Sequence, residues 1–205
     1  MGHLIFDFDG TIVDSGHVVF KSLSESTCHT GLTWDELRDL PSHKVVSALG
    51  ITKLDLPKLI LKVRNDFKNQ IKNQPLADGI AEALVELKEQ GFKLYIVSSN
   101  SKENIEEFLK IHRLFDAFTT ITSFFTIFGK AHGVEKLLGK LRIEPAKAIY
   151  IGDETRDIQA AEKVGIKSLA VCWGYNSAKV LASYNPVYLA KTPKDMVAIL
   201  CKARA

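Results

Sequence analysis

Short apolar runs alternate with amphipathic segments along the second half of the chain. From about Phe92 onward, each run rich in β-branched and aromatic residues is followed by a segment with apolar residues three or four positions apart. Such runs are typical of buried strands, and such spacing is typical of helices. The alternation therefore predicts a parallel sheet covered by helices. We expect strands over residues 93–99, 117–122, 148–153 and 168–173, and helices over residues 102–111, 130–141, 155–164 and 177–184.

One more strand opens the chain, far in sequence from the others. Residues 4–8 read LIFDF, which is apolar enough for a buried strand, and Gly10 ends it. The next expected strand starts only at residue 93. The chain in between shows helical spacing over residues 17–27, 33–40, 44–50, 56–71 and 80–91.

These elements predict an α/β protein in two parts. We expect a Rossmann-like core with a parallel sheet, formed by residues 1–15 and 75–205, and an all-helical cap of residues 16–74 inserted after the first strand. The segment Asn73-Gln74-Pro75 is expected to return the chain to the core. Because the cap leaves the sheet beside Asp7 and Asp9, it is expected to overhang them as a lid.

Composition places the chain among ordinary globular proteins. Its 205 residues are 46% hydrophobic and 25% charged, and the net charge of +3 is spread without a basic block, so we expect no nucleic-acid partner. Asp7 and Asp9 interrupt the apolar start, and no run approaches the roughly 18 apolar residues that span a bilayer, so we expect no signal peptide and no membrane association. The pattern carries no sign of an oligomeric state. An odd number of cysteines without a CxxC pair favours a reducing cytoplasm, the three being Cys28, Cys172 and Cys201.

The two aspartates after the first strand are the strongest functional signal. Asp7 and Asp9 fall at the carboxyl end of that strand, the edge of a parallel sheet where ligands bind. Two carboxylates this close repel each other, unless a cation lies between them or one of them keeps its proton. We therefore interpret the pair as part of a site rather than as a turn.

Other strand ends carry matching chemistry. Hydroxyl and amide groups precede a helix after the second strand, where they are suited to hold an anion such as phosphate. A lysine at a helix start opposes the local dipole, which favours an anionic partner for it. With few histidines at ligand spacing, the oxygen-rich set favours Mg²⁺ over zinc, and a carboxylate nucleophile with Mg²⁺ and a lysine indicates phosphoryl transfer. The residues are Ser98, Ser99, Asn100, Lys130, Asp153 and Asp157.

The motifs resemble those of haloacid dehalogenase superfamily phosphatases, in the order of that family. DFDGT matches the DxDGT signature, which implies Asp7 as the nucleophile and Asp9 as the general acid/base. Ser98 matches the phosphoryl-binding residue of the second motif, and Lys130 matches the lysine of the third. GDETRD matches the fourth motif, which implies Asp153 as a metal ligand and Asp157 as its support. The resemblance also implies Mg²⁺ bound by Asp7, Asp153 and the backbone carbonyl of Asp9.

Two further segments resemble the phosphoglycolate phosphatase-like branch, which carries a helical cap. They are WGYNS and the closing PVYLAKTPKDMVAIL. The second motif reads SSNS where that branch often has Thr-Asn, and Ser42, His43 and Lys44 stand near the place of its substrate-specificity loop. The implied activity is hydrolysis of a small phosphorylated metabolite through an aspartyl-phosphate on Asp7.

Alternatives remain open for the whole chain and for single residues. A phosphomutase of the β-phosphoglucomutase type would use the same aspartates, and a non-catalytic binding or regulatory module would keep the fold. Thr11 is either a site hydroxyl or an organiser of the backbone. Asp14 and Ser15 are expected to cap the next helix. For His43 an exposed position at a helix start is favoured, and Trp34 and Trp173 are expected to be packing residues.

Overall fold

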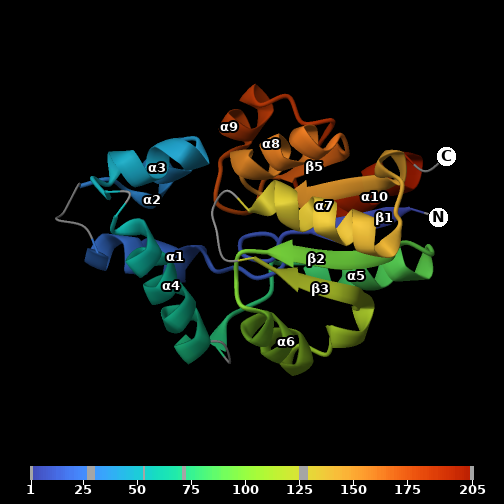
Figure 1. Cartoon of the computed structure of the whole chain (residues 1–205), viewed down its shortest axis with the longest axis horizontal. Helices are drawn as coiled ribbons and strands as arrows, with labels where there is room; N and C mark the ends of the chain where they lie inside the picture. Colours follow the sequence, from blue (N-terminus) through green and yellow to red (C-terminus); the bar gives the residue numbers. More distant parts are fainter. Residues whose placement is uncertain (1, 27–30, 53, 71–72, 125–128, 204–205) are drawn as a thin grey trace.

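In the described part of the chain, a single sheet of six parallel strands forms the centre of the molecule (Figure 1). The computed structural model describes residues 2–26, 31–52, 54–70, 73–124 and 129–203, so Cys28 and the predicted helix ends at residues 27 and 71 lie outside it. The spatial order is β3-β2-β1-β4-β5-β6. The strands span His3–Phe6, Lys93–Ser98, Phe118–Ser123, Ala148–Gly152, Lys167–Val171 and Tyr188–Ala190 for β1 to β6.

The central strand β1 is buried on both faces, which explains its unbroken apolar run. Leu4 and Phe6 belong to one core cluster with residues of α5 (Ile80–Glu89), α6 (Lys102–Ile111) and α10 (Pro193–Ala203). Ile5, which points to the opposite face, belongs to a second cluster with residues of α7 (Lys130–Leu141) and α8 (Thr155–Val164). The sheet is thus covered by helices on both faces, and the predicted α/β class is confirmed.

The chain between β1 and α5 forms helices that lie together at one end of the sheet (Figure 1). Two main-chain hydrogen bonds join the outgoing and returning segments, from Asp14 N–H to Pro75 O at 3.0 Å and from Ala77 N–H to Ile12 O at 2.9 Å. We call residues 16–74 the insertion; their status as a separate cap domain stays a prediction. Its helices are α1 (Gly16–Ser26), α2 (Trp34–Arg38), α3 (Ser42–Ala48) and α4 (Leu56–Gln70).

Some elements differ from the expectation. β1 ends at Phe6, because Phe8 and Gly10 already belong to a turn in which Ile12 N–H donates to Phe8 O at 2.9 Å. The strand β6 was not predicted, since three residues are too short for a recognisable pattern. The short α9 (Ala178–Ser183) agrees with the helix expected after β5. Within the described residues, no helix is both long and apolar enough to cross a membrane.

Candidate active site

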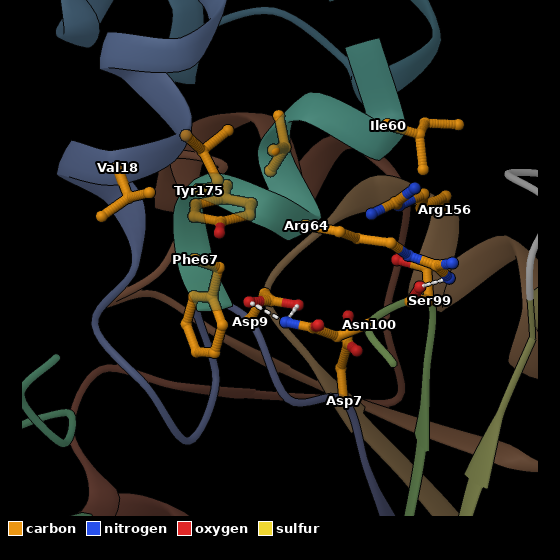
Figure 2. Close-up of a pocket in the computed structure, with 12 residues that line it drawn as sticks. Asp7, Asp9, Val18, Ile60, Arg64, Phe67, Ser99, Asn100, Arg156 and Tyr175 are labelled. Carbon is orange, nitrogen blue, oxygen red and sulfur yellow. Dashed lines mark hydrogen bonds between the residues drawn. The ribbon is translucent and has the colours of Figure 1, made fainter. Parts of the chain in front are cut away.

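A cavity of about 150 Å³ opens between the carboxyl edge of the sheet and the insertion (Figure 2). Asp7 and Asp9 form its floor, and Ser99 and Asn100 come from the turn after β2. Apolar residues of α1 and α4 line the side formed by the insertion, and Tyr175 closes part of the rim. The parallel strands therefore bring the predicted residues to one edge, and residues of the insertion line the other side of the cavity. The role of the insertion as a lid stays a prediction.

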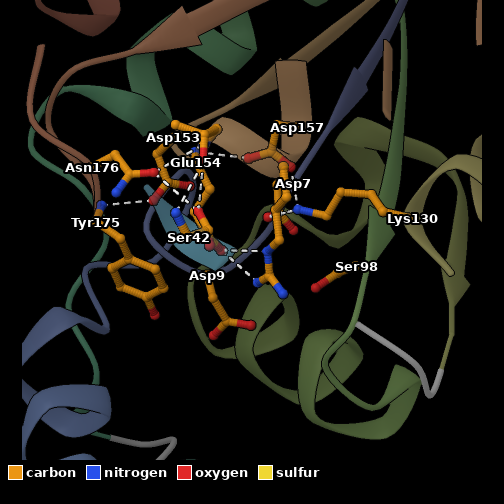
Figure 3. A network of polar contacts seen from close by, with 12 residues as sticks. Asp7, Asp9, Ser42, Ser98, Lys130, Asp153, Glu154, Asp157, Tyr175 and Asn176 are labelled. Atoms are coloured by element: carbon orange, nitrogen blue, oxygen red, sulfur yellow. Dashed lines mark hydrogen bonds and ion pairs between the residues drawn. The ribbon is translucent and has the colours of Figure 1, made fainter. Parts of the chain in front are cut away.

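Asp7 lies at the centre of a buried ion-pair cluster (Figure 3). Its main-chain N–H donates to Ile151 O of β4 at 2.8 Å, which places the side chain directly beyond the strand. Lys130, the first residue of α7, reaches Asp7 Oδ2 at 2.6 Å and also pairs with Asp157 of α8. All three side chains are at most 4% exposed. Burial lowers the pKa of Lys130, but Asp157 and Asp7 outweigh that effect, so its pKa is raised and the ammonium stays charged.

Asp153 is held in the turn after β4 by two donors. Thr11 Oγ1 donates to its Oδ1 and the main-chain N–H of Tyr175 donates to its Oδ2, both at 2.7 Å. A Cβ at Gly10 would lie 2.2 Å from Asp153 Oδ2, and one at Gly174 would lie 2.3 Å from the Asp153 Cβ. Two glycines thus make room for this carboxylate, and Gly10 also adopts a φ of +75°. Thr11 therefore contacts the predicted metal ligand Asp153 through its side chain, and its main chain is part of the turn.

The carboxylates of Asp7, Asp153 and Asp157 form a group that could hold a metal ion. One oxygen of each lies within 4.8 Å of the others, and all three residues are buried. Burial, together with the charges of Glu154 and Asp157, raises the pKa of Asp153 well above its ordinary value. Burial also raises the pKa of Asp157 to about 7, against the opposing effect of Lys130. A divalent cation would offset this concentration of negative charge, and carboxylate oxygens suit a hard cation.

Asp9 points away from that group and into the cavity. Asn100 Nδ2 lies 3.2 Å from both of its carboxylate oxygens, and Ser15 Oγ donates to Oδ1 at 3.3 Å. Burial and the charge of Asp7 raise the pKa of Asp9 to about 7. This carboxyl group can therefore exchange a proton near neutral pH. Asn100 contacts a predicted site residue, whereas the metal contact expected of the Asp9 carbonyl stays a prediction.

The two serines after β2 differ in their contacts. The buried Ser98 hydroxyl accepts a hydrogen bond from Asn100 N–H at 3.1 Å, and Figure 3 shows it on the side of Lys130. Ser99 lines the cavity, and its carbonyl accepts from Arg64 of α4. The same Arg64 nitrogen donates to Phe124 O at 3.0 Å. Arg64 thus joins the insertion to the ends of β2 and β3.

The expected roles of several neighbouring residues need correction or refinement. The Ser15 hydroxyl does not face the helix after it but Asp9 and the hydroxyl of Tyr175, which is 2.6 Å away. Ser15 differs from the prediction because the tight turn after β1 directs its side chain toward the site. Ser42 N–H donates to Thr155 Oγ1 at 3.0 Å, so this insertion residue contacts the core. His43 and Lys44 are exposed on α3.

Sequence reasoning missed four polar residues near the cavity. Arg156 lies within the GDETRD motif and pairs with Glu154, so the motif itself could have indicated it. Tyr175 and Asn176 lie in the WGYNS segment, where aromatic and amide groups after a strand were a weaker signal. Arg64 is one of several cations on an amphipathic helix, and no local pattern distinguishes it.

Comparison with known proteins shows the family to which the chain belongs. Residues 4–171 match the family described as haloacid dehalogenase-like hydrolase. The chain is 32% identical over 203 residues to a phosphoglycolate phosphatase of Synechococcus elongatus, covering 96% of each protein. It is 25% identical over 210 residues to the pyrophosphatase PpaX of Bacillus mycoides, covering 97% of this chain and 96% of the relative. A predicted phosphatase from Clostridium acetobutylicum shares the fold with a TM-score of 0.81, at 22% identity and 98% coverage of both chains.

Proposed function

The chain belongs to the haloacid dehalogenase-like hydrolase family and is a phosphatase, and we propose that it hydrolyses a small phosphorylated metabolite with Mg²⁺, through a phosphoenzyme on Asp7. One observation carries the proposal. Asp7, a buried carboxylate paired with Lys130, lies two residues before Asp9, a carboxyl group whose pKa is raised to about 7. Both aspartates line the same cavity. We also propose a cytoplasmic location, which suits a chain with three cysteines and no CxxC pair.

In the proposed first step, a carboxylate oxygen of Asp7 attacks the phosphorus atom and the bond from phosphorus to the ester oxygen breaks. Asp9, in its protonated form, transfers its proton to that leaving oxygen. A carboxyl group with a pKa near the working pH is suited to such a transfer, which typically contributes about 10² to 10⁴ in rate. The product alcohol then departs through the cavity.

In the second step, a water molecule attacks the phosphorus atom of the phosphoenzyme. Asp9, now a carboxylate, takes a proton from this water, and the bond from phosphorus to the Asp7 oxygen breaks. Inorganic phosphate leaves, and both aspartates return to their starting states. Asn100, which donates to Asp9, would orient that carboxylate for both transfers.

Charge stabilisation is the other requirement, since a carboxylate and a phosphate dianion repel each other. We propose that Asp7, Asp153 and the Asp9 carbonyl hold Mg²⁺, with Asp157 in support. When bound, this ion would neutralise phosphoryl and carboxylate oxygens. Lys130 pairs with Asp7 and adds a positive charge beside it. We propose that the Ser98 hydroxyl and the main-chain amide of Ser99 bind phosphoryl oxygens.

The experiment is turnover of p-nitrophenyl phosphate with and without MgCl₂, by the wild-type protein and by Asp7→Asn. We expect magnesium-dependent hydrolysis that the variant lacks. An acid quench of the wild-type reaction should trap phosphate on the protein, and Asp14→Asn, an exposed acidic residue in the same loop, serves as the control. Equal rates for wild type and Asp7→Asn would contradict the mechanism.

A further inference from the structure

The cavity wall opposite the catalytic aspartates is apolar. Val18 and Val19 of α1 and Ile60, Val63 and Phe67 of α4 line it. Figure 2 shows Val18, Phe67 and Ile60 around the space in front of Asp9. Since Asp9 protonates the leaving oxygen in the proposed mechanism, the group attached to that oxygen must lie against these side chains.

Arg156, one of the two arginines that line the cavity, is already paired with a carboxylate, since its Nε donates to Glu154 Oε1 at 2.9 Å. Arg64 keeps its charge because its carbonyl partners are neutral, but its bonds to the carbonyls of Ser99 and Phe124 hold it toward the ends of β2 and β3. A second phosphate in the leaving-group position, as in pyrophosphate, would bring further negative charge against Ile60 and Val63. Burying charge against apolar side chains is costly unless a partner neutralises it. The same argument applies to a carboxylate in that position.

The size of the cavity limits the leaving group. Its volume is about 150 Å³, and part of that must hold the phosphoryl group beside Asp7. An apolar cavity of roughly 150 Å³ in another protein binds one benzene molecule. The space therefore suits a compact body of about three to six carbon atoms.

We propose that the substrate is a phosphomonoester of a compact, uncharged and largely apolar alcohol, which the wall of Val18, Val19, Ile60, Val63 and Phe67 selects over pyrophosphate and over carboxylate-bearing esters such as phosphoglycolate. This inference rests on the proposed function for the site but not on the names of the relatives. Burial of substrate carbon against the wall accounts for the selection. Each additional buried methylene is worth about a three- to fourfold gain in kcat/KM.

The test compares isosteric substrates. Isobutyl phosphate and phosphoglycolate have the same heavy-atom skeleton, with two methyl groups replaced by two carboxylate oxygens, and pyrophosphate is the third substrate. We expect kcat/KM for isobutyl phosphate to exceed both others by about tenfold or more, and to rise from methyl through propyl phosphate. The inference is overturned if kcat/KM does not rise along the alkyl series. It is also overturned if pyrophosphate or phosphoglycolate has the highest kcat/KM.

A binding measurement separates this inference from the proposed mechanism. Titration calorimetry with 3-methylbutylphosphonate, 3-phosphonopropionate and methylenediphosphonate, in MgCl₂, uses non-hydrolysable forms of the same three substrates. Tighter binding of the alkyl compound supports selection by the apolar wall, whether or not any ester is hydrolysed. If no ester is hydrolysed, only the proposed function is contradicted. Equal or weaker binding of the alkyl compound counts against the wall, whatever the turnover.

Variants locate the selection on α4. Val63→Thr keeps the shape of the side chain and adds a hydroxyl, and we expect it to lower kcat/KM for isobutyl phosphate about three- to tenfold while phosphoglycolate changes less. Leu61→Thr is the matched control, because Leu61 is 47% exposed on the same helix. An equal loss for all substrates in Val63→Thr would indicate a structural effect and contradict selection by this residue.

Discussion

The main-chain N–H of Ser42 donates a hydrogen bond to Thr155 Oγ1 across 3.0 Å, and thereby joins the first residue of α3 to the first residue of α8. The Ser42 hydroxyl also donates to Asn176 Oδ1 at 3.1 Å. Thr155 and Asn176 are buried, and Thr155 lies two residues after Asp153. The position of the insertion is therefore linked to the loop that carries a predicted metal ligand.

Thr155→Val should loosen this contact. The substitution keeps the shape but removes the acceptor of the Ser42 N–H, and an unsatisfied group of this kind costs about 1–3 kcal/mol. We expect that loss in the free energy of unfolding, measured by urea denaturation, together with a raised KM. Ser47→Ala is the control, since its hydroxyl bonds Lys44 O within the exposed part of α3. If both variants behave alike, the contact does not hold the insertion.

Lys130→Met should leave two buried carboxylates without their cation. Removing one partner of a buried ion pair costs about 3–5 kcal/mol, so the unfolding free energy in EDTA should fall by about that amount. Added MgCl₂ should restore part of the stability, because an ion bound at Asp7 and Asp153 replaces part of the lost charge. Lys136→Met, at an exposed position of α7, should change neither quantity. The absence of a larger magnesium effect in Lys130→Met would contradict a metal site beside Asp7.

Gly174→Ala should displace Asp153. A Cβ there would meet the Asp153 side chain at 2.3 Å, so the carboxylate must move. We expect a loss of stability of about 1–3 kcal/mol and a smaller rise in Tm on addition of MgCl₂. For the control Gly139→Ala, the new Cβ has no neighbour within 4 Å, and an alanine in helix α7 should add about 0.5–1 kcal/mol. An unchanged magnesium response in Gly174→Ala would show that Asp153 does not bind the ion.

Asp9→Asn should stabilise the metal-free protein at high pH. The pKa of Asp9 is raised from 3.8 to about 7, so between these values the folded state keeps a proton that the unfolded state has lost. The unfolding free energy of the wild type therefore falls as the pH rises through this window, and above it the penalty of the buried charge is complete. In EDTA, we expect the variant to exceed the wild type by on the order of 1 kcal/mol or more at pH 8, and the difference to shrink toward pH 4.

The same pH series needs a control for general charge effects. Asp14→Asn removes an exposed carboxylate from the same loop and should show little dependence of this kind. A stability difference for Asp9→Asn that stays constant from pH 4 to pH 8 would refute the raised pKa. Loss of turnover in this variant, despite its greater stability, would fit a proton-transfer role.

Much of the site was predictable because a parallel sheet brings its strand ends together. Asp7, Ser98 and Asp153 directly follow or end three adjacent strands, so local patterns were enough to group them. Lys130 was predictable as a cation at a helix start beside the same edge.

Contacts that depend on how separate segments pack were not predictable. Arg64 reaches Ser99 only because α4 lies beside the turn after β2, and nothing in the local sequence predicts that arrangement. Ser15 has the sequence of a helix cap, but the turn after β1 directs its hydroxyl to Asp9. The observed ends of strands and short turns differ from the predicted ends by one or two residues for the same reason, because tertiary hydrogen bonds determine where these elements end.

The central position of β1 has a consequence for synthesis of the chain. β1 leaves the ribosome before its two partners, since β2 and β4 begin only at Lys93 and Ala148. At about 5–20 residues per second, the strand waits roughly 7–30 seconds before the second neighbour exists. Until β2 is made, the apolar residues of β1 have no partner strand, and until β4 is made, one edge of β1 stays unpaired. Asp7, the proposed nucleophile, is thus made long before β4 and Asp157, which complete its surroundings.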